Sequence, residues 1–203
     1  MSMWDSRYSD TGFAYGNEAN DFLAEQAPHV LPSVSQVLCL AEGEGRNAVA
    51  LAKLGHNITA VDLSEPGLKK AKTLALENHV SIETIVADLA TYDLGNNQWD
   101  AIVSIFCHVP PPIRRNLHQN IIQALKPGGI LILEAYTPTQ LKFGTGGPPT
   151  AAMMMSLQDL RQELKGLDFD IGRELERNVM EGKYHTGRGH VVQVVARKNR
   201  NII

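Results

Sequence analysis

Residues 37–62 constrain the fold of this chain more than any other stretch, and they read VLCLAEGEGRNAVALAKLGHNITAVD. An apolar run (37–41) is followed by glycines at positions 43 and 45, an amphipathic segment (46–54), and a second apolar run (58–61) that ends on Asp62. This order predicts a buried strand, a turn, a helix and a second buried strand. Such a βαβ unit presents ligand-binding groups at the carboxyl ends of its strands, so we expect a nucleoside-bearing ligand there.

The alternation of strand and helix patterns continues along the chain. Apolar runs at 82–86, 99–107 and 130–135 predict three more strands, and helices are expected after Ser64 and from the prolines at 110–112. A helix at 156–164 precedes two late strands, 169–177 and 190–197, which a glycine-rich hairpin joins. We predict an α/β fold: a three-layer sandwich around a Rossmann-like, seven-stranded, mostly parallel sheet with an antiparallel C-terminal strand pair.

A length of 203 residues fits one domain with a sizeable core. We expect residues 1–203 to form a single domain with an N-terminal cap or flap (1–36), a ligand-binding core (37–135), and a lid loop with the C-terminal strands (136–203). The aromatic N-terminal segment either covers one end of the sheet or closes over a ligand, and the two roles are compatible. A short helix is expected at 18–26, because prolines at 28 and 32 disfavour its continuation.

The charge balance excludes several classes of partner. A formal net charge of −3 and a pI of about 6.2 offer no basic surface to nucleic acid. No apolar run approaches the ~18 residues of a membrane span, and the N-terminus lacks a signal-peptide pattern. We therefore expect a cytoplasmic protein, a monomer or weak homodimer, with no nucleic-acid or membrane partner.

Cysteine and histidine spacing gives no indication of a metal. Cys39 and Cys107 lie in apolar runs and are expected to be buried free thiols. His185 and His190 lie five apart without a carboxylate or cysteine at metal-ligand spacing, so we expect no metal site.

The charges in the glycine turn indicate what kind of ligand it holds. A dinucleotide-binding turn has a third glycine, but Ala48 stands at that position. Glu42 and Glu44 lie within the turn, where they would repel a pyrophosphate and attract an ammonium group. These residues favour an amino acid joined to a nucleoside over NAD. Arg46 is expected to pair either with the carboxylate of this ligand or with one of the two glutamates.

Two further carboxylates follow strands on the same edge of the predicted sheet. Asp62 lies 17 positions after Gly45, and a carboxylate there accepts hydrogen bonds from both ribose hydroxyls of a nucleoside. Asp88 follows the next strand and either accepts from the exocyclic amine of adenine or holds its own loop. For Asp62 the alternative is that it caps the helix that starts at Ser64. We favour the ligand role for both.

Taken together, four stretches resemble class I S-adenosylmethionine-dependent methyltransferases: residues 37–62, Ala87-Asp88-Leu89, the apolar run 99–107, and the LKPGG turn before the strand 130–135. The resemblance covers residues 35–135. The opening WDSRY…YG…N.FL is also similar to the N-terminus of the tellurite-resistance and thiopurine methyltransferase branch. One departure stands in the turn, where Cys39-Leu40-Ala41-Glu42 replaces the family's acidic residue, Leu, Gly and a small residue.

This resemblance implies S-adenosyl-L-methionine as the cofactor. The loop 42–45 would hold its methionine moiety, Asp62 its ribose, and Asp88-Leu89 its adenine. The implied cofactor-binding residues are Arg7, Tyr15, Glu42, Gly43, Glu44, Gly45, Arg46, Asp62, Leu63, Ala87, Asp88, Leu89 and Ile105.

The acceptor end of the site carries three candidate catalytic residues. His108 is able to act as a base or to contact the substrate, and it is equally suited to a structural hydrogen bond. Tyr136 is able to line the acceptor pocket, and His185 lies in the glycine-rich hairpin. Phe106 either shapes the adenosyl pocket or belongs to the core, and residues 153–155 (Met-Met-Met) are lid or core filler. No Asn-Pro-Pro-Tyr sequence is present, which argues against N-methylation of adenine or amides. Transfer to a thiolate needs mainly in-line positioning, so a catalytic base is not required.

We therefore predict a methyltransferase that acts by direct displacement on a small-molecule acceptor, such as a thiol or a chalcogen oxyanion. Two alternatives remain open at this point. One is an NAD-dependent oxidoreductase, which the missing third glycine and the loop glutamates oppose. The other is a non-catalytic module that binds a nucleoside and methylates nothing.

Overall fold

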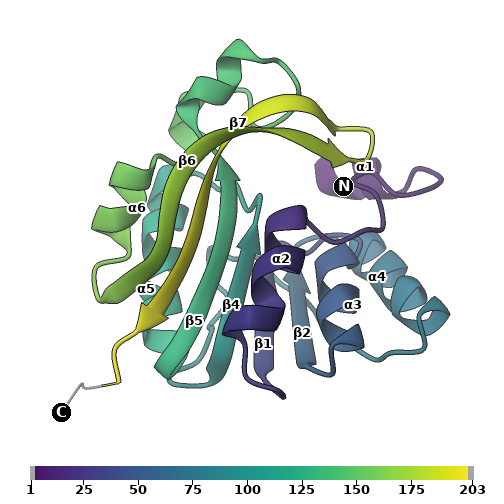
Figure 1. Ribbon diagram of the computed structural model, residues 1–203. Coiled ribbons are helices and arrows are strands. Elements are labelled where there is room, and N and C mark those ends of the chain that lie inside the picture. Colours follow the sequence, from purple (N-terminus) through teal and green to yellow (C-terminus); the bar gives the residue numbers. More distant parts are fainter. Residues whose placement is uncertain (1–2, 201–203) are drawn as a thin grey trace.

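In the computed structural model, which describes residues 3–200, seven strands form one sheet (Figure 1). In chain order they are β1 (Gln36–Leu40), β2 (Asn57–Asp62), β3 (Glu83–Val86), β4 (Trp99–Ile105), β5 (Leu125–Tyr136), β6 (Leu167–Glu181) and β7 (His185–Lys198). Their order across the sheet is β3-β2-β1-β4-β5-β7-β6. The pairs among β1 to β5 are parallel, whereas β7 runs antiparallel to β5 and to β6. The predicted fold class is confirmed.

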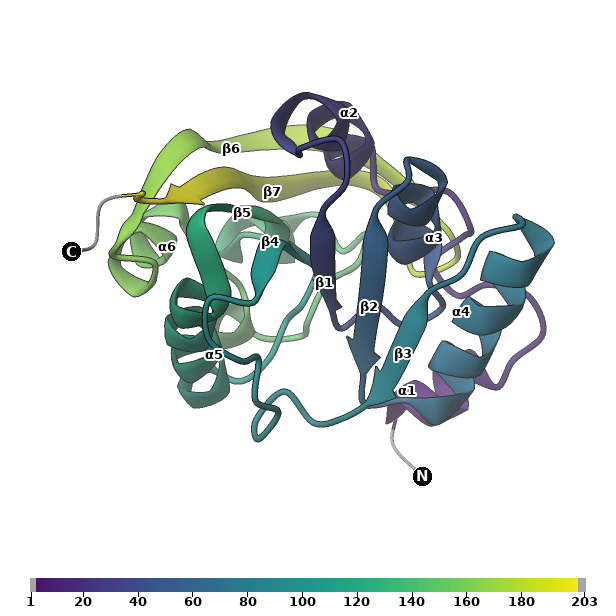
Figure 2. The same cartoon turned by 90° about the horizontal axis from the view of Figure 1, so that it is seen from below.

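Helices cover both faces of the sheet (Figures 1 and 2). The α-helices are α1 (Met3–Tyr8), α2 (Asp21–Val30), α3 (Arg46–Lys53), α4 (Glu65–Glu77), α5 (Pro111–Ala124) and α6 (Leu157–Glu163), and η1 (Pro138–Lys142) and η2 (Ala151–Met153) are short 3-10 helices. Strand side chains alternate between the two faces. Val37 and Cys39 of β1 pack with α2 and α3, while Leu38 and Leu40 pack with α5 and α6.

Local capping explains where two of these helices begin. Ser64 accepts a hydrogen bond from the backbone N–H of Gly67 at the start of α4, and Ser156 accepts one from Asp159 at the start of α6. Both starts were predicted. The helix expected at 18–26 instead begins at Asp21, behind the N-cap Asn20, and continues through Pro28 to Val30. Pro28 removes one backbone hydrogen bond near the end of this helix, and the burial of Phe22 and Leu23 stabilises the helix despite that loss.

Two strand boundaries differ from expectation. β4 ends at Ile105 rather than Cys107, because Phe106 adopts a positive φ of 52° and turns the chain. The segment Lys126-Pro127-Gly128-Gly129 belongs to the beginning of β5 rather than to a turn before it. Gly128 has a φ of 82°, and the register between β4 and β5 shifts beside it, so the strand is irregular at that point.

The C-terminal hairpin is longer than the strand patterns indicated. β6 and β7 pair as far as Glu181 and His185, so the predicted glycine-rich connection at 178–189 shrinks to a turn at 182–184. Figure 1 shows the two strands curving over the carboxyl ends of the parallel strands toward α1. At the tip, Lys183 donates its backbone N–H to the carbonyl of Ala14 at 3.0 Å. The hairpin and the N-terminal segment therefore meet above the sheet.

A buried network of charges fixes this arm of the hairpin. Arg177 of β6 pairs with Glu134 of β5 at 2.5 Å and with Glu181 at 2.9 Å, and Glu134 is fully buried. Glu181 also pairs with Arg46, at the start of α3, at 2.5 Å. The side-chain amide of Asn20 donates to both glutamates, at 2.8 Å each. Because a buried charge without a partner is costly, these contacts specify where β6 lies.

Replacing Arg177 by methionine tests the energetic weight of this network. The change leaves the buried Glu134 carboxylate without its cationic partner, so we expect the free energy of unfolding to fall by ~3–5 kcal/mol in urea denaturation. The matched control is Arg188→Met, which removes an ion pair to Glu176 between two exposed side chains. That loss should stay below ~1 kcal/mol. Equal effects of the two changes would show that the network does not stabilise the arm.

Candidate functional site

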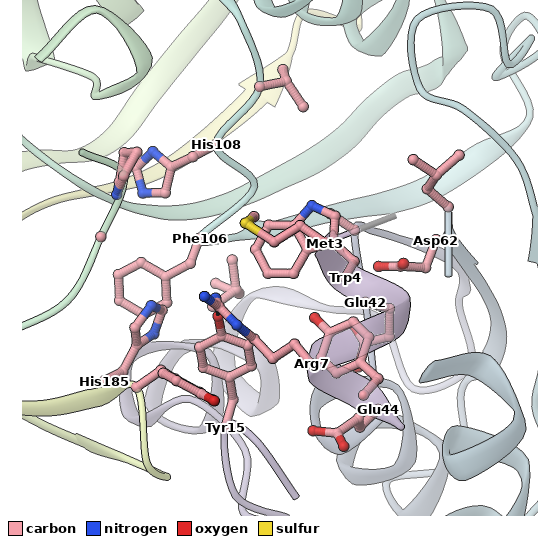
Figure 3. Close-up of a pocket in the computed structure, with 18 of the residues that line it drawn as sticks. Met3, Trp4, Arg7, Tyr15, Glu42, Glu44, Asp62, Phe106, His108 and His185 are labelled. Atoms are coloured by element: carbon pink, nitrogen blue, oxygen red, sulfur yellow. Dashed lines mark hydrogen bonds between the residues drawn. The ribbon is translucent and has the colours of Figure 1, made fainter. Parts of the chain in front are cut away.

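A cavity of about 610 Å³ opens at the carboxyl ends of β1, β2 and β4. Its walls come from segments far apart in the sequence: α1, the 15–16 turn, the 41–47 loop, the ends of β2 and β3, residues 105–109, part of the lid loop, and Tyr184 with His185 of the hairpin. Figure 3 shows the acidic side chains on one side of this cavity and Phe106, His108 and His185 on the other. The cavity therefore has a charged end and an aromatic end.

Most of the implied cofactor-binding residues do line this cavity. They are Arg7, Tyr15, Glu42, Glu44, Arg46, Asp62, Leu63, Ala87, Asp88, Leu89 and Ile105. Gly43 and Gly45 are not among the lining residues. A Cβ on Gly43 would lie 2.6 Å from the hydroxyl oxygen of Tyr8, and one on Gly45 would lie 2.5 Å from the Cβ of Ala71 in α4. These two glycines therefore let α1 and α4 approach the loop closely.

Asp62 holds the loop as well as facing the cavity. Its carboxylate accepts the backbone N–H of Gly43 at 2.9 Å and that of Ser64 at 2.8 Å. The side chain is buried, and burial raises its pKa. Each carboxylate oxygen keeps a further lone pair for a ligand. The helix-capping role and the ligand role of Asp62 are therefore compatible.

The two glutamates of the loop have different surroundings. Glu42 accepts the backbone N–H of Ala48 at 2.8 Å, and burial raises its pKa to about 7. Glu44 instead pairs with Lys70 at 2.9 Å and accepts the backbone N–H of Ala14 at 2.7 Å. Glu44 thus connects the N-terminal segment to the loop. Of the two loop glutamates, Glu42 is the one that forms no ion pair with a cation of residues 3–200.

Arg46 pairs with neither of the two glutamates of the loop. Its guanidinium pairs with Glu181 of β6 instead, and Arg46 also lines the cavity, where its contact with the carboxylate of a ligand stays a prediction. Asp88 is exposed on the rim, where its carboxylate accepts the backbone N–H of Ala90 at 2.8 Å. Asp88 therefore holds its loop and also lines the cavity.

Arg7 is the cation that faces the cavity from α1. Its guanidinium donates to the Tyr15 hydroxyl at 2.5 Å and lies 5.1 Å from the Trp4 ring centroid and 4.3 Å from that of Tyr184. No carboxylate of residues 3–200 forms an ion pair with it. The N-terminal segment therefore does more than cover the sheet. It brings the Arg7 cation and the rings of Trp4, Tyr8 and Tyr15 to the cavity.

At the aromatic end, three rings surround His185. Their centroids lie 4.6 Å (Tyr15), 4.7 Å (Phe106) and 5.2 Å (Tyr136) from that of the imidazole. The Nδ1 atom of His185 and the hydroxyl of Tyr136 are buried without a hydrogen-bond partner in the described chain. Burial lowers the pKa of His185 to about 3 and raises that of Tyr136. Both side chains are therefore neutral near pH 7.

His108 has a structural environment by contrast. Its Nδ1 lies 3.0 Å from the carbonyl of Met153, and its Nε2 accepts the backbone N–H of Tyr136 at 3.2 Å. Because a carbonyl only accepts, Nδ1 carries the proton and Nε2 the lone pair. Both ring nitrogens are thus occupied in joining β5 to the lid loop.

Met153 lines the cavity, whereas Met154 and Met155 are buried in the core, so the methionine run serves both expected purposes.

Sequence reasoning missed several lining residues. Met3 and Trp4 lie in α1, whose sequence has no apolar periodicity that predicts a helix. Asn47 and Tyr184 belong to no recognisable sequence motif. The aromatic richness of the N-terminal segment was the one usable signal.

No helix within residues 3–200 is long and apolar enough to span a bilayer.

Comparisons with known proteins agree with this architecture. Residues 37–129 match the family described as "Methyltransferase domain". The ubiquinone biosynthesis O-methyltransferase of Xanthomonas campestris is 31% identical over 112 residues, which cover 54% of this chain and 46% of that protein. The chain thus spans about half the length of this curated relative.

Two solved structures share the fold over nearly the whole chain. TehB from Haemophilus influenzae has a TM-score of 0.74 at 19% identity, covering 97% of this chain and 66% of that one. A SAM-dependent methyltransferase from Methanosarcina mazei has a TM-score of 0.71 at 17% identity, covering 91% and 100%. The resemblance to class I methyltransferases, whose methyl donor is S-adenosylmethionine, is confirmed. Residues 37–129 of this chain are therefore similar to the methyltransferase domain family, and the chain as a whole has the fold of these solved methyltransferases.

Proposed function

We propose that this chain is an S-adenosylmethionine-dependent methyltransferase that acts on a small molecule by direct displacement. One observation carries the proposal: a single cavity joins the carboxylates at the ends of β1, β2 and β3 to the aromatic group around His185. A methyl donor with nucleoside and amino-acid parts suits the charged end. The aromatic end leaves room for an acceptor beside the donor.

The residues of the charged end match the parts of the donor by chemistry. Asp62, which lines the cavity, is assigned to the ribose hydroxyls, and residues 87–89, which also line it, are assigned to the adenine. Glu42 is assigned to the ammonium group. The carboxylate of the donor is assigned to Arg7 with Tyr15, because Arg46 is already neutralised by Glu181.

The rest of the cavity serves to position the acceptor and to exclude water. When bound, the donor supplies an electrophilic methyl group on a sulfonium. α1 and the hairpin tip cover the cavity from above, and Phe106 and Tyr15 form apolar walls. Holding the two reactants in line inside such an enclosure is the main catalytic contribution that a methyl transfer requires. The enclosure by itself favours neither a thiol nor a chalcogen oxyanion as the acceptor.

An acceptor screen tests the activity. The chain is incubated with S-adenosylmethionine and a panel of thiols, hydroxyl compounds, amines and oxyanions, and S-adenosylhomocysteine is quantified. Calorimetry with S-adenosylhomocysteine and with NAD is run in parallel. Binding of NAD alone would indicate an oxidoreductase, which Glu42 and Ala48 in the turn disfavour. Donor binding without any transfer would indicate a non-catalytic binding module.

Substitution of Asp62 tests the donor site. Asp62→Ala should weaken S-adenosylhomocysteine binding about 5- to 150-fold, or ~1–3 kcal/mol, because charged hydrogen bonds to the ribose are lost. Calorimetry measures the affinity, and thermal unfolding checks that the loop held by Asp62 is still folded. Asp168→Ala, an exposed carboxylate on β6, is the control and should bind normally. An unchanged affinity for Asp62→Ala would remove this residue from the donor site.

The raised pKa of Glu42 predicts pH-dependent donor binding. An ammonium group favours the ionised carboxylate, so binding lowers the pKa of Glu42 from about 7 and releases protons. Affinity should therefore rise with pH as it approaches 7, by at most about tenfold per unit, and level off above it. Calorimetry in buffers of different ionisation enthalpy counts the released protons. Glu42→Gln should flatten the profile, and a profile that stays equally steep would assign it to another group.

A further inference from the structure

Two buried polar atoms at the aromatic end are not explained by the fold. Neither the Nδ1 atom of His185 nor the hydroxyl of Tyr136 has a hydrogen-bond partner within residues 3–200. A buried polar group left without a partner costs ~1–3 kcal/mol, so such pairs in native proteins call for an explanation. His185 lines the cavity. A ligand group at this end is the explanation that the geometry offers.

The two side chains lie close together under the lid loop. A Cβ added to Gly146, which also lines the cavity, would lie 3.2 Å from the Tyr136 hydroxyl oxygen and 3.0 Å from Cδ2 of His185. Both rings also contact Phe106, at centroid distances of 4.6 Å for Tyr136 and 4.7 Å for His185. Of the two, His185 reaches the cavity, whereas Tyr136 is fully buried and is not among the lining residues.

The position of His185 is fixed from outside the cavity. The turn 182–184 packs on the N-terminal segment so tightly that a Cβ on Gly182 would lie 2.4 Å from the backbone nitrogen of Gly16. Just before the turn, the buried Arg46–Glu181 pair anchors the end of β6. This rigidity is what a residue that orients a substrate requires.

Resting on the proposed methyl transfer, we propose that His185 binds the nucleophilic group of the acceptor, and that this group is a neutral hydroxyl or thiol rather than an oxyanion. A neutral imidazole offers a lone pair to an X–H group. It carries no positive charge for an anion. The nearby cations are committed elsewhere, since Arg46 and Arg177 pair with glutamates and Arg7 is assigned to the donor carboxylate.

The reaction balances without a strong base. A lone pair of X attacks the methyl carbon, the X–C bond forms, and the C–S bond breaks with both electrons remaining on sulfur. The methylated X–H group is then a cation far more acidic than imidazolium, so its proton passes to His185 and on to solvent. A weakly basic imidazole is sufficient for this late proton transfer.

Two substitutions of His185 separate binding from chemistry. Neutral probes (2-mercaptoethanol and catechol) are compared with anionic probes (selenite and tellurite) at saturating S-adenosylmethionine. His185→Phe should lower kcat/KM for the neutral probes about 100-fold or more. His185→Gln, which keeps a hydrogen-bonding amide, should retain the acceptor KM but lower kcat. In both variants the dissociation constant for S-adenosylhomocysteine should stay within about threefold of the wild type.

The matched control is His190→Gln, on the same strand. His190 hydrogen-bonds to Thr137 outside the cavity, so kcat and KM should be unchanged. Imidazole NMR adds a readout that does not need turnover. His185 should remain neutral down to about pH 4 and shift when 2-mercaptoethanol is added to the complex with S-adenosylhomocysteine. The titratable and charged groups that face it are Arg7, Tyr15, Arg46, His108, Tyr136, Glu181 and Tyr184.

The possible outcomes are distinguishable. A preference for selenite or tellurite over the neutral probes, or an unchanged kcat/KM in His185→Phe, would overturn the role of His185 and leave the methyltransferase proposal standing. Failure of the wild-type chain to bind S-adenosylhomocysteine would overturn the proposed function itself. Donor binding without transfer to either class of probe would count against both proposals.

Discussion

The enclosure of the cavity depends on the buried ion pair between Arg46 and Glu181. Arg46 begins α3, directly after the loop that borders the charged end, and Glu181 ends β6, four residues before His185. Burial alone would raise the pKa of Glu181, but Arg46 and Arg177 hold it below its usual value. The carboxylate therefore stays ionised, and the pair joins the two ends of the cavity.

Around that pair the chain forms a closed ring of contacts. The Glu44 carboxylate accepts the backbone N–H of Ala14, whose carbonyl accepts the backbone N–H of Lys183. Two residues before Lys183, Glu181 pairs with Arg46, which lies two residues after Glu44. The ring contains the donor loop, the N-terminal segment and the hairpin tip. These contacts therefore connect the loop at the charged end of the cavity with the hairpin that carries His185 at the aromatic end.

Features that depend on local periodicity could be predicted from the sequence. The alternation of strands and helices, the N-caps Ser64 and Ser156, and the positions of Asp62 and Asp88 at strand ends all follow from residues within a few positions of each other. The partner of Arg46 could not be predicted, because Glu181 lies 135 positions away and both nearby glutamates are equally plausible by charge. The hairpin was underestimated because its glycines indicate turns, whereas pairing in the sheet accommodates most of them.

The histidines show why residue type alone does not reveal a catalytic role. Both His108 and His185 were candidates in the sequence, and both lie against Phe106 at the aromatic end. Their difference comes from the backbone around them. The carbonyl of Met153 and the N–H of Tyr136 occupy both nitrogens of His108. The strands beside His185 pair with each other, and its Nδ1 atom has no hydrogen-bond partner within residues 3–200. A polar side chain is free to bind a ligand when the backbone groups around it make their hydrogen bonds with other partners. The tertiary structure determines whether this is so.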